Sequence, residues 1–239
     1  GSFTSGRREI NWDGVPDAFA EPNLLPLDFF NVNSPRGVIF NSIEDETGAA
    51  LNQFSVSATN ASGTAVRFAN INATYSSIFT TFSAERLFTM KNAHMMEVNF
   101  VIPGTNIPAT VSGFGVVLTD VDSATGGDRT LIRVYGKDGR QLSAASAPVL
   151  NNGLSFVGIS FNAGERIARV VIESLKLETF TDEKGLYSFP RVPAGEVAVR
   201  VIYTGFPVET QTVRVVAGQR AERDFSLRSS KDVAADGTV

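Results

Sequence analysis

Three aspartates around one loop carry the clearest metal-binding chemistry in this chain. Asp120, Asp122 and Asp128 flank the segment TDVDSATGGD, in which carboxylates alternate with other residues and glycines permit a tight bend. Ca²⁺ takes about six to eight oxygen ligands, so spaced carboxylates and backbone carbonyls on a loop are suitable donors. The same residue types are also ordinary turn formers. A structural calcium ion is therefore the only cofactor that the sequence suggests, and a plain turn is the simpler interpretation.

A second group of residues has the chemistry of a sugar site. Trp12 is the only tryptophan and Asp13 follows it in INWDG, so an indole face and a carboxylate could stack on and hydrogen-bond one sugar ring. Tyr75 and Phe79, with Phe82 nearby, offer another aromatic platform in an Asn- and Thr-rich segment. The structural alternative is burial as framework aromatics. We favour that alternative for Trp12 because tryptophan is usually well buried.

No residue pattern indicates an enzyme. His94 is the only histidine, and the absence of cysteine excludes disulfides, thiol catalysis and zinc–thiolate sites. The chain has no G-x-S-x-G elbow, P-loop or dinucleotide fingerprint. A pair of carboxylates for glycoside hydrolysis leaves no spacing signature and stays as the residual alternative. We expect a protein that is not an enzyme.

Composition limits the class of partner. The 239 residues are 43% hydrophobic and 19% charged, and no run of about 18 apolar residues could span a membrane. A net charge of −4 without a Lys/Arg cluster argues against nucleic acid as a partner. All fifteen asparagines fall at or before Asn162, whereas 22 of the 46 charged residues lie in the last 76 positions. This shift in composition favours two domains.

Alternating apolar residues predict β-structure throughout the first part. Thr110 to Thr119 is the strongest core strand, and Asp138-Gly139 is the dipeptide of a type I′ hairpin turn. Only Ser83 to Lys91 has a helical pattern, with Ser83 as its N-cap. Further strands are expected near residues 38–40, 54–56, 66–68, 98–102, 131–135, 154–161 and 167–172. About eight strands at this spacing predict a jelly roll.

The last part predicts a smaller all-β domain. A turn at 181–185 contains Asp182 and Gly185, and short strands are expected at 186–189, 197–203 and 213–215. Phe225 and Leu227 belong to a final strand. The motifs TDEKGLYSF, PAGEVAVRV and AGQRAERDFSL resemble the carboxypeptidase-regulatory-like domain over about residues 168–227. That resemblance implies a transthyretin-like β-sandwich, as found in bacterial surface proteins and in TonB-dependent receptors.

The opening strand that this family normally has before ARVVIESLKLETF has no counterpart here. An exposed sheet edge would result, and another strand of this chain or of a neighbouring chain should cover it.

The first part also has a resemblance. GRREINWDGVPDAF, LPLDFFNVNSPRGVIF, VNFVIPGT, GFGVVLTDVD and LSFVGISFNAGERIARVVI are similar to a secreted bacterial lectin-like jelly-roll β-sandwich. The similarity covers most of residues 6–172, but the usual closing strand rich in Asp and aromatic residues is missing. The segment ARVVIES fits both families, which indicates a fusion at this point.

These observations predict an all-β protein: a jelly-roll-like β-sandwich over residues 1–172, a small Ig/transthyretin-like β-sandwich over 173–227 and a polar tail over 228–239. We expect a non-catalytic bacterial module outside the cytoplasm: extracellular, on the cell surface or periplasmic. Its partner would be a glycan or a surface protein, without nucleic acid and without membrane insertion. The alternative function is structural, with strands exchanged between subunits to build a homo-oligomer or filament.

Overall fold

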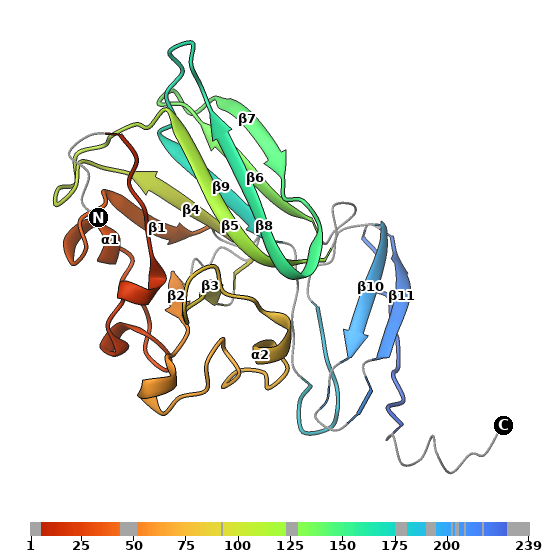
Figure 1. The fold of residues 1–239 in the computed structure, drawn as a ribbon. Helices are drawn as coiled ribbons and strands as arrows, with labels where there is room; N and C mark the ends of the chain where they lie inside the picture. The colour runs from red at the N-terminus through yellow and green to blue at the C-terminus, as the bar shows by residue number, and fades with distance from the viewer. Residues whose placement is uncertain are drawn as a thin grey trace. The chain divides into compact units, whose positions relative to one another are not determined.

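The computed structural model describes residues 6–43, 52–91, 93–122, 129–174, 181–189, 195–201, 203, 206–207, 209–216 and 218–228. The chain divides into two compact units, and the described residues up to Ser174 form the first. Every strand pair is antiparallel, and the helices are single turns (Figure 1). The all-β prediction is confirmed.

The first unit is built on a five-stranded sheet in the order β1-β4-β9-β6-β7. The centre of the sheet is apolar: Val98 lies opposite Val170, and Ile132 opposite Ile172. Such pairs of branched side chains suit a buried, pleated surface. The strands are β1 (Val38–Ser42), β4 (Met95–Phe100), β6 (Thr130–Tyr135), β7 (Gln141–Ser146) and β9 (Arg169–Ser174).

A two-stranded antiparallel sheet forms the second layer. β5 (Gly113–Val121) pairs with β8 (Leu150–Ser160), and Figure 1 shows these strands in front of the five-stranded sheet. Their alternation divides the side chains between two faces. One face packs on the core cluster that contains Phe40, Val98, Ile132 and Val170; it consists of Phe114, Val116, Leu118, Val157 and Ile159. The other face of this two-stranded sheet is turned to solvent.

An aromatic group closes one end of this core. Two short strands, β2 (Gln53–Val56) and β3 (Phe88–Lys91), pair with each other, and the rings of Phe54 and Phe88 are stacked 5.6 Å apart. The predicted helix at Ser83 to Lys91 is therefore wrong. The short helical turns around the core are η1 (Trp12–Gly14), η2 (Asp17–Phe19), α1 (Phe29–Val32), η3 (Asn60–Ser62) and α2 (Tyr75–Ile78).

The hairpin between β6 and β7 forms as expected, but its turn type differs. Gly139 alone has a positive φ, at 78°, whereas a type I′ turn needs two such residues, and Asp138 is not among them. The Asp138 carboxylate instead accepts a hydrogen bond from the backbone N–H of Arg140 at 3.1 Å. The pairing then shifts register between Val134 and Tyr135, so a bulge absorbs the longer loop.

The second unit contains one regular strand pair among its described residues. β10 (Gly195–Val201) pairs with β11 (Glu209–Val215) over seven positions. The predicted turn at 181–185 is present: Gly185 has φ of 77°, and the Asp182 carboxylate accepts backbone hydrogen bonds from Lys184 and Leu186. Residues 186–189 and 221–228 are not strands, contrary to expectation. Tyr187 donates a hydrogen bond to the Arg223 carbonyl instead and contacts Phe225.

No helix in the described part of the chain is long and apolar enough to cross a membrane.

Candidate functional site

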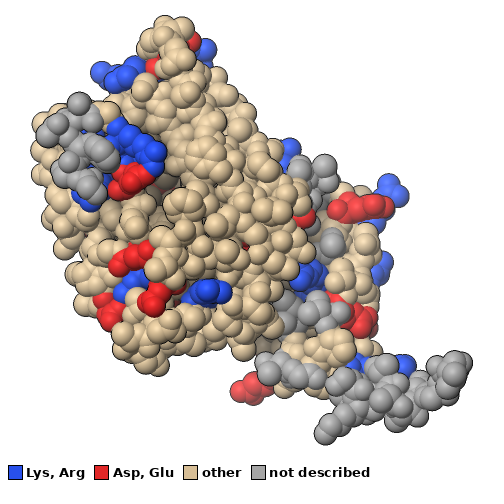
Figure 2. All heavy atoms as spheres, in the orientation of Figure 1, with Lys and Arg blue, Asp and Glu red and all other residues tan. Residues whose placement is uncertain are grey.

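One aromatic ring stands out on the solvent face of the two-stranded sheet formed by β5 and β8. Phe156 is 64% exposed although it lies in the middle of a strand. Val117 lies directly opposite Phe156 in the strand pair. Two positions further along, Gly115 lies opposite Gly158. β8 carries no charged residue and β5 carries only Asp120, and Figure 2 shows few charged side chains over these strands. A flat apolar surface results.

The two glycines form the floor under this ring. A Cβ atom placed on Gly115 would lie 3.0 Å from the Cε2 and Cζ atoms of Phe156, and one placed on Gly158 would lie 3.0 Å from Cε1. These distances are shorter than ordinary van der Waals contact, so only glycine lets the ring lie down on the sheet. Covering glycines with an aromatic ring also protects the strand pair. One face of the ring is thus held, and the other faces solvent.

Polar groups lie near the Asn152 end of the sheet formed by β5 and β8. The backbone N–H of Thr80 donates to Thr119 Oγ1 at 2.9 Å, and the Thr80 hydroxyl donates to the Asn152 carbonyl at 3.0 Å. These bonds hold the segment that follows α2 against β5 and β8. Phe82, which is 76% exposed, follows two residues later. Asn152 and Phe156 lie four positions apart in β8, a span of about 13 Å.

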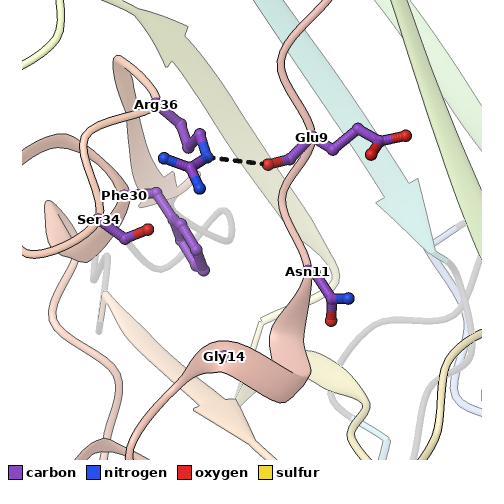
Figure 3. Close-up of a pocket in the computed structure, with 6 residues that line it drawn as sticks. All are labelled: Glu9, Asn11, Gly14, Phe30, Ser34 and Arg36. Carbon is purple, nitrogen blue, oxygen red and sulfur yellow. Dashed lines mark hydrogen bonds between the residues drawn. The ribbon is translucent and has the colours of Figure 1, made fainter. Parts of the chain in front are cut away.

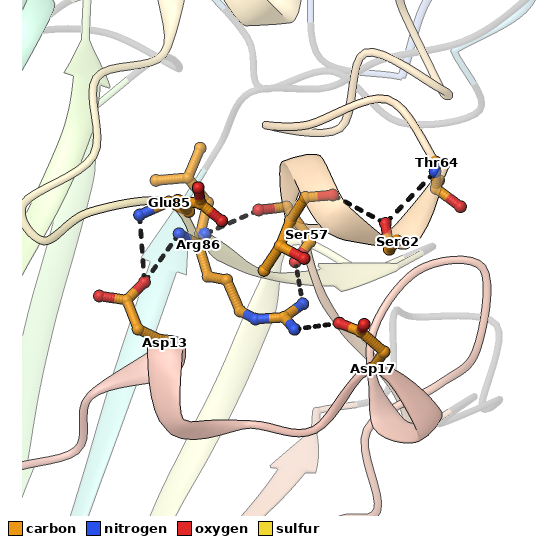
Figure 4. Close-up of polar contacts among 9 residues, drawn as sticks. Asp13, Asp17, Ser57, Ser62, Thr64, Glu85 and Arg86 are labelled. Atoms are coloured by element: carbon orange, nitrogen blue, oxygen red, sulfur yellow. Dashed lines mark hydrogen bonds and ion pairs between the residues drawn. The ribbon is translucent and has the colours of Figure 1, made fainter.

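Trp12 and Asp13 of the predicted sugar site have structural partners. The indole of Trp12 stacks on Phe88 with ring centroids 4.2 Å apart and meets Phe30 edge-on at 5.4 Å. The Asp13 carboxylate accepts hydrogen bonds from the backbone N–H groups of Arg86 at 2.9 Å and Glu85 at 3.2 Å (Figure 4). Burial raises the pKa of Asp13, but hydrogen bonds from the Ser83 hydroxyl and these amides outweigh it, so the pKa lies below its usual value.

Tyr75 and Phe79 lie together at α2. Their ring centroids are 4.6 Å apart, and Tyr75 is only 7% exposed. Arg67 binds this segment through hydrogen bonds from Nη1 to the carbonyls of Ser76 at 3.1 Å and Phe79 at 3.4 Å. The ring pair therefore belongs to the support of the segment that ends at Thr80, beside the exposed face.

The structure describes two of the three aspartates of the predicted calcium loop. Asp120 is 8% exposed with φ of 56°, at the point where the pairing of β5 and β8 shifts register, and it accepts a hydrogen bond from the backbone N–H of Asn152 at 2.9 Å. Asp122 follows the end of β5. Asp128 lies outside the described residues. Within the described ranges, no group of three acidic or histidine side chains is placed to hold a metal ion, and calcium stays a prediction.

A small polar cleft lies beside η1. It has a volume of about 240 Å³ and is lined by Glu9, Asn11, Gly14, Phe30, Ser34 and Arg36 (Figure 3). The Arg36 guanidinium donates from Nε to the Glu9 carbonyl at 3.1 Å. Phe30 is only 2% exposed, so the cleft lacks an exposed aromatic face of the kind that Phe156 offers.

Arg86 organises the loops around η1 and η2. It is 4% exposed, donates from Nη1 to the Ser57 carbonyl at 2.7 Å and forms an ion pair with Asp17 through Nη2 (Figure 4). Its buried Nε has no hydrogen-bond partner among the described residues. Buried charges persist only when paired, so this contact is structural.

Glu21 is the second buried charge of this region. Its carboxylate accepts hydrogen bonds from the Ser55 hydroxyl, from Asn70 Nδ2 at 2.9 Å and from Lys91 Nζ at 3.1 Å. Burial raises the pKa of Glu21, but these bonds and the Lys91 charge outweigh it, so the pKa lies below its usual value. The group is satisfied within the fold and offers no free carboxylate for catalysis.

Sequence reasoning missed Phe156 and Arg36. The signal for Phe156 is present in LSFVGIS, where Val157 and Ile159 face the core and the phenylalanine falls in phase with Gly158 on the solvent face. An apolar ring at a strand position that alternation assigns to solvent indicates a functional surface. Arg36 left no signal, because the cleft forms only when residues 9–14 and 30–36 come together.

Comparison with known proteins gives one result for the chain. The model of the carboxypeptidase regulatory-like domain matches residues 162–228, which confirms the expected nature of the second domain. This domain type is a non-catalytic β-sandwich module. The match includes β9, a strand of the first unit that pairs with β4 on one edge and with β6 on the other. No curated protein and no solved structure matches the chain.

Proposed function

We propose that this protein is a carbohydrate-binding module outside the cytoplasm and that the solvent face of β5 and β8 is its binding surface. One observation carries the proposal: Phe156 is 64% exposed while its ring lies on Gly115 and Gly158. The ring is rigid before any ligand arrives, so binding orders little new structure. An exposed aromatic in mid-strand has no role in the core and suits a binding surface.

The chemistry around the ring fits a sugar. The C–H face of a pyranose can stack on a flat aromatic ring, and its hydroxyls need neutral hydrogen-bonding groups nearby. Asn152 and Ser160 are exposed on β8, on either side of Phe156, and neither carries a charge. Phe82 supplies another exposed ring near the Asn152 end. This surface favours an extended chain of sugar units that lies along β5 and β8, rather than a single buried sugar.

Replacing Phe156 with alanine should weaken glycan binding. Loss of the stacking surface should lower the affinity by roughly tenfold, about 1.4 kcal/mol. A panel of soluble polysaccharides, followed by calorimetric titration of those that bind, measures the change. Gly115→Ala should give a smaller loss, because its methyl group displaces the ring without removing it.

Tyr203→Ala is the matched control, since Tyr203 is 62% exposed and lies in the second unit. It should bind like the parent protein. Equal affinity of the parent and the Phe156→Ala variant would contradict the proposal.

Self-assembly through sheet edges is a second candidate function, and the five-stranded sheet supplies a specific observation for it. The outer edge of β1 is capped: the N–H of Phe40 donates to the Leu27 carbonyl at 3.0 Å, and that of Ser42 to Asn52 Oδ1 at 2.8 Å. β7 has no such cap within the described residues. Its sequence QLSAAS contains neither proline nor charge, the usual devices that protect an edge.

A lysine on the edge of β7 should block this association. The N–H of Ala147 points toward β6, where it bonds the Thr130 carbonyl, so by alternation the amides of Ala144 and Ser146 point outward. Two copies paired antiparallel about a twofold axis would bring the Ala144→Lys side chains together, and we expect at least tenfold weaker self-association by light scattering over a concentration series. Ala61→Lys, on the exposed turn η3, is the control. A parent protein that stays monomeric at millimolar concentration excludes pairing through β7.

A further inference from the structure

We infer that the cleft beside η1 is an oxyanion site that takes the carboxylate or phosphate group of a small ligand. The site is separate from Phe156 and does not depend on the carbohydrate proposal. Its lining residues come from the segment before and within η1, from α1 and from the segment that follows α1 (Figure 3). Three features determine the kind of ligand: the donors that remain free, the acceptors that are already used, and the size.

The cleft offers hydrogen-bond donors without partners. Arg36 donates through Nε to the Glu9 carbonyl and weakly through Nη1 to the Pro35 carbonyl at 3.5 Å, while its Nη2 has no partner among the described residues. Asn11 uses Oδ1 to accept from the N–H of Asp13 at 2.9 Å and from the Ser83 hydroxyl at 3.4 Å, and Figure 3 shows its amide on the side away from Arg36. The Ser34 hydroxyl bonds no group in the described ranges. A guanidinium fixed by backbone carbonyls is prepared to bind a planar oxyanion.

The two acceptor groups of Glu9 are engaged. The Glu9 carbonyl already receives the Arg36 Nε hydrogen bond. The Glu9 side chain points away from Arg36 in Figure 3, and its carboxylate pairs with Arg7. A ligand entering the cleft therefore meets the Arg36 charge and the Ser34 hydroxyl, while the Glu9 carboxylate is turned away from Arg36. This arrangement favours an anion over a neutral sugar, because a neutral hydroxyl would gain no charge-assisted bond.

Size limits the ligand further. Pockets for drug-sized ligands hold about 300–1,000 Å³, and the cleft holds about 240 Å³. A single sugar acid or a phosphate fits that volume, whereas a longer chain would extend into solvent. Gly14 lines the cleft, and a Cβ placed on it would meet no atom within 4 Å, so a side chain can begin at this residue without a clash.

Titrations with glucuronate, glucose and inorganic phosphate test the inference, followed by ¹H–¹⁵N chemical-shift changes in the intact chain. Glucuronate should bind at least tenfold more tightly than glucose, with shifts at residues 9–14 and 34–36. Gly14→Leu, which fills the cleft, and Arg36→Gln, which removes its charge, should each weaken binding about tenfold. Phosphate binding at the same residues without glucuronate binding would identify phosphate as the ligand group and supports the oxyanion assignment.

Equal binding of glucuronate and glucose, or shifts that map elsewhere, would overturn the inference. Gly14→Leu guards against a folding artefact: its thermal unfolding midpoint should equal that of the parent protein, so a loss of binding reports on the cleft alone. Phe156→Ala separates the two proposals, since it should leave glucuronate binding at the cleft unchanged. Loss of glucuronate binding in Phe156→Ala would contradict a separate oxyanion site.

Discussion

Replacing Asp17 with alanine should lower the free energy of unfolding by about 3–5 kcal/mol, more than replacing its buried partner Arg86. The asymmetry follows from exposure: the Asp17 side chain is 56% exposed and that of Arg86 is 3%. Without Asp17, the guanidinium stays buried with the Ser57 carbonyl as its remaining acceptor, and its charge is uncompensated. Without Arg86, in Arg86→Met, the aspartate is hydrated, and the orphaned Ser57 carbonyl costs about 1–3 kcal/mol.

Urea unfolding followed by the fluorescence of Trp12, the only tryptophan, measures both variants in the first unit. Arg140→Ala is the control in the same unit, since Arg140 and Asp138 form a pair with side chains 71% and 67% exposed. Its cost should stay within about 0.5 kcal/mol, as for most exposed ion pairs. A smaller cost for Asp17→Ala than for Arg86→Met would show that Asp17 does not neutralise the buried charge.

Phe54→Ala should also cost about 3–5 kcal/mol, because a fully buried ring is lost and leaves a cavity. Phe54 is 0% exposed, lies opposite Met90 in β3, and its ring is 5.8 Å from that of Phe40 and 5.6 Å from that of Phe88. The midpoint of urea unfolding should fall while the slope of the transition stays constant.

Phe82→Ala provides the comparison for this prediction, since Phe82 is 76% exposed and should change stability by less than about 0.5 kcal/mol. A stability loss of similar size in both variants would contradict the position of the aromatic group at the core.

Strand alternation and turn residues were sufficient to predict the all-β class. Val98 alternates with polar neighbours in β4, and the Asp138-Gly139 hairpin joins the strands expected on either side of it. The helix predicted at Ser83 failed for a tertiary reason. The residues of β3 find partners in β2, and the N–H of Leu87, which a helix would direct to the Ser83 carbonyl, donates to Ser57 Oγ at 2.8 Å. Local propensity is a weak prior against such contacts.

The candidate site was harder to predict, because burial decides which aromatic residue is available. The sequence offered Trp12 as a sugar platform but favoured its burial, and in the structure its ring stacks on Phe88 and meets Phe30 edge-on. Phe156 looked like another core residue of LSFVGIS until its register with Gly115 and Gly158 was fixed by pairing. A shift of one residue in that pairing would exchange the two faces. The binding surface is thus a property of register, which composition does not specify.

The most direct test of the carbohydrate proposal is the ¹H spectrum of a bound oligosaccharide. Sugar C–H protons that stack on the face of Phe156 should move upfield through the ring current when the parent protein binds. With folded Phe156→Ala, the same protons should keep the chemical shifts of the unbound oligosaccharide. Upfield shifts that persist in Phe156→Ala, or an oligosaccharide that binds the parent without any upfield shift, would contradict the assignment of β5 and β8 as the binding surface.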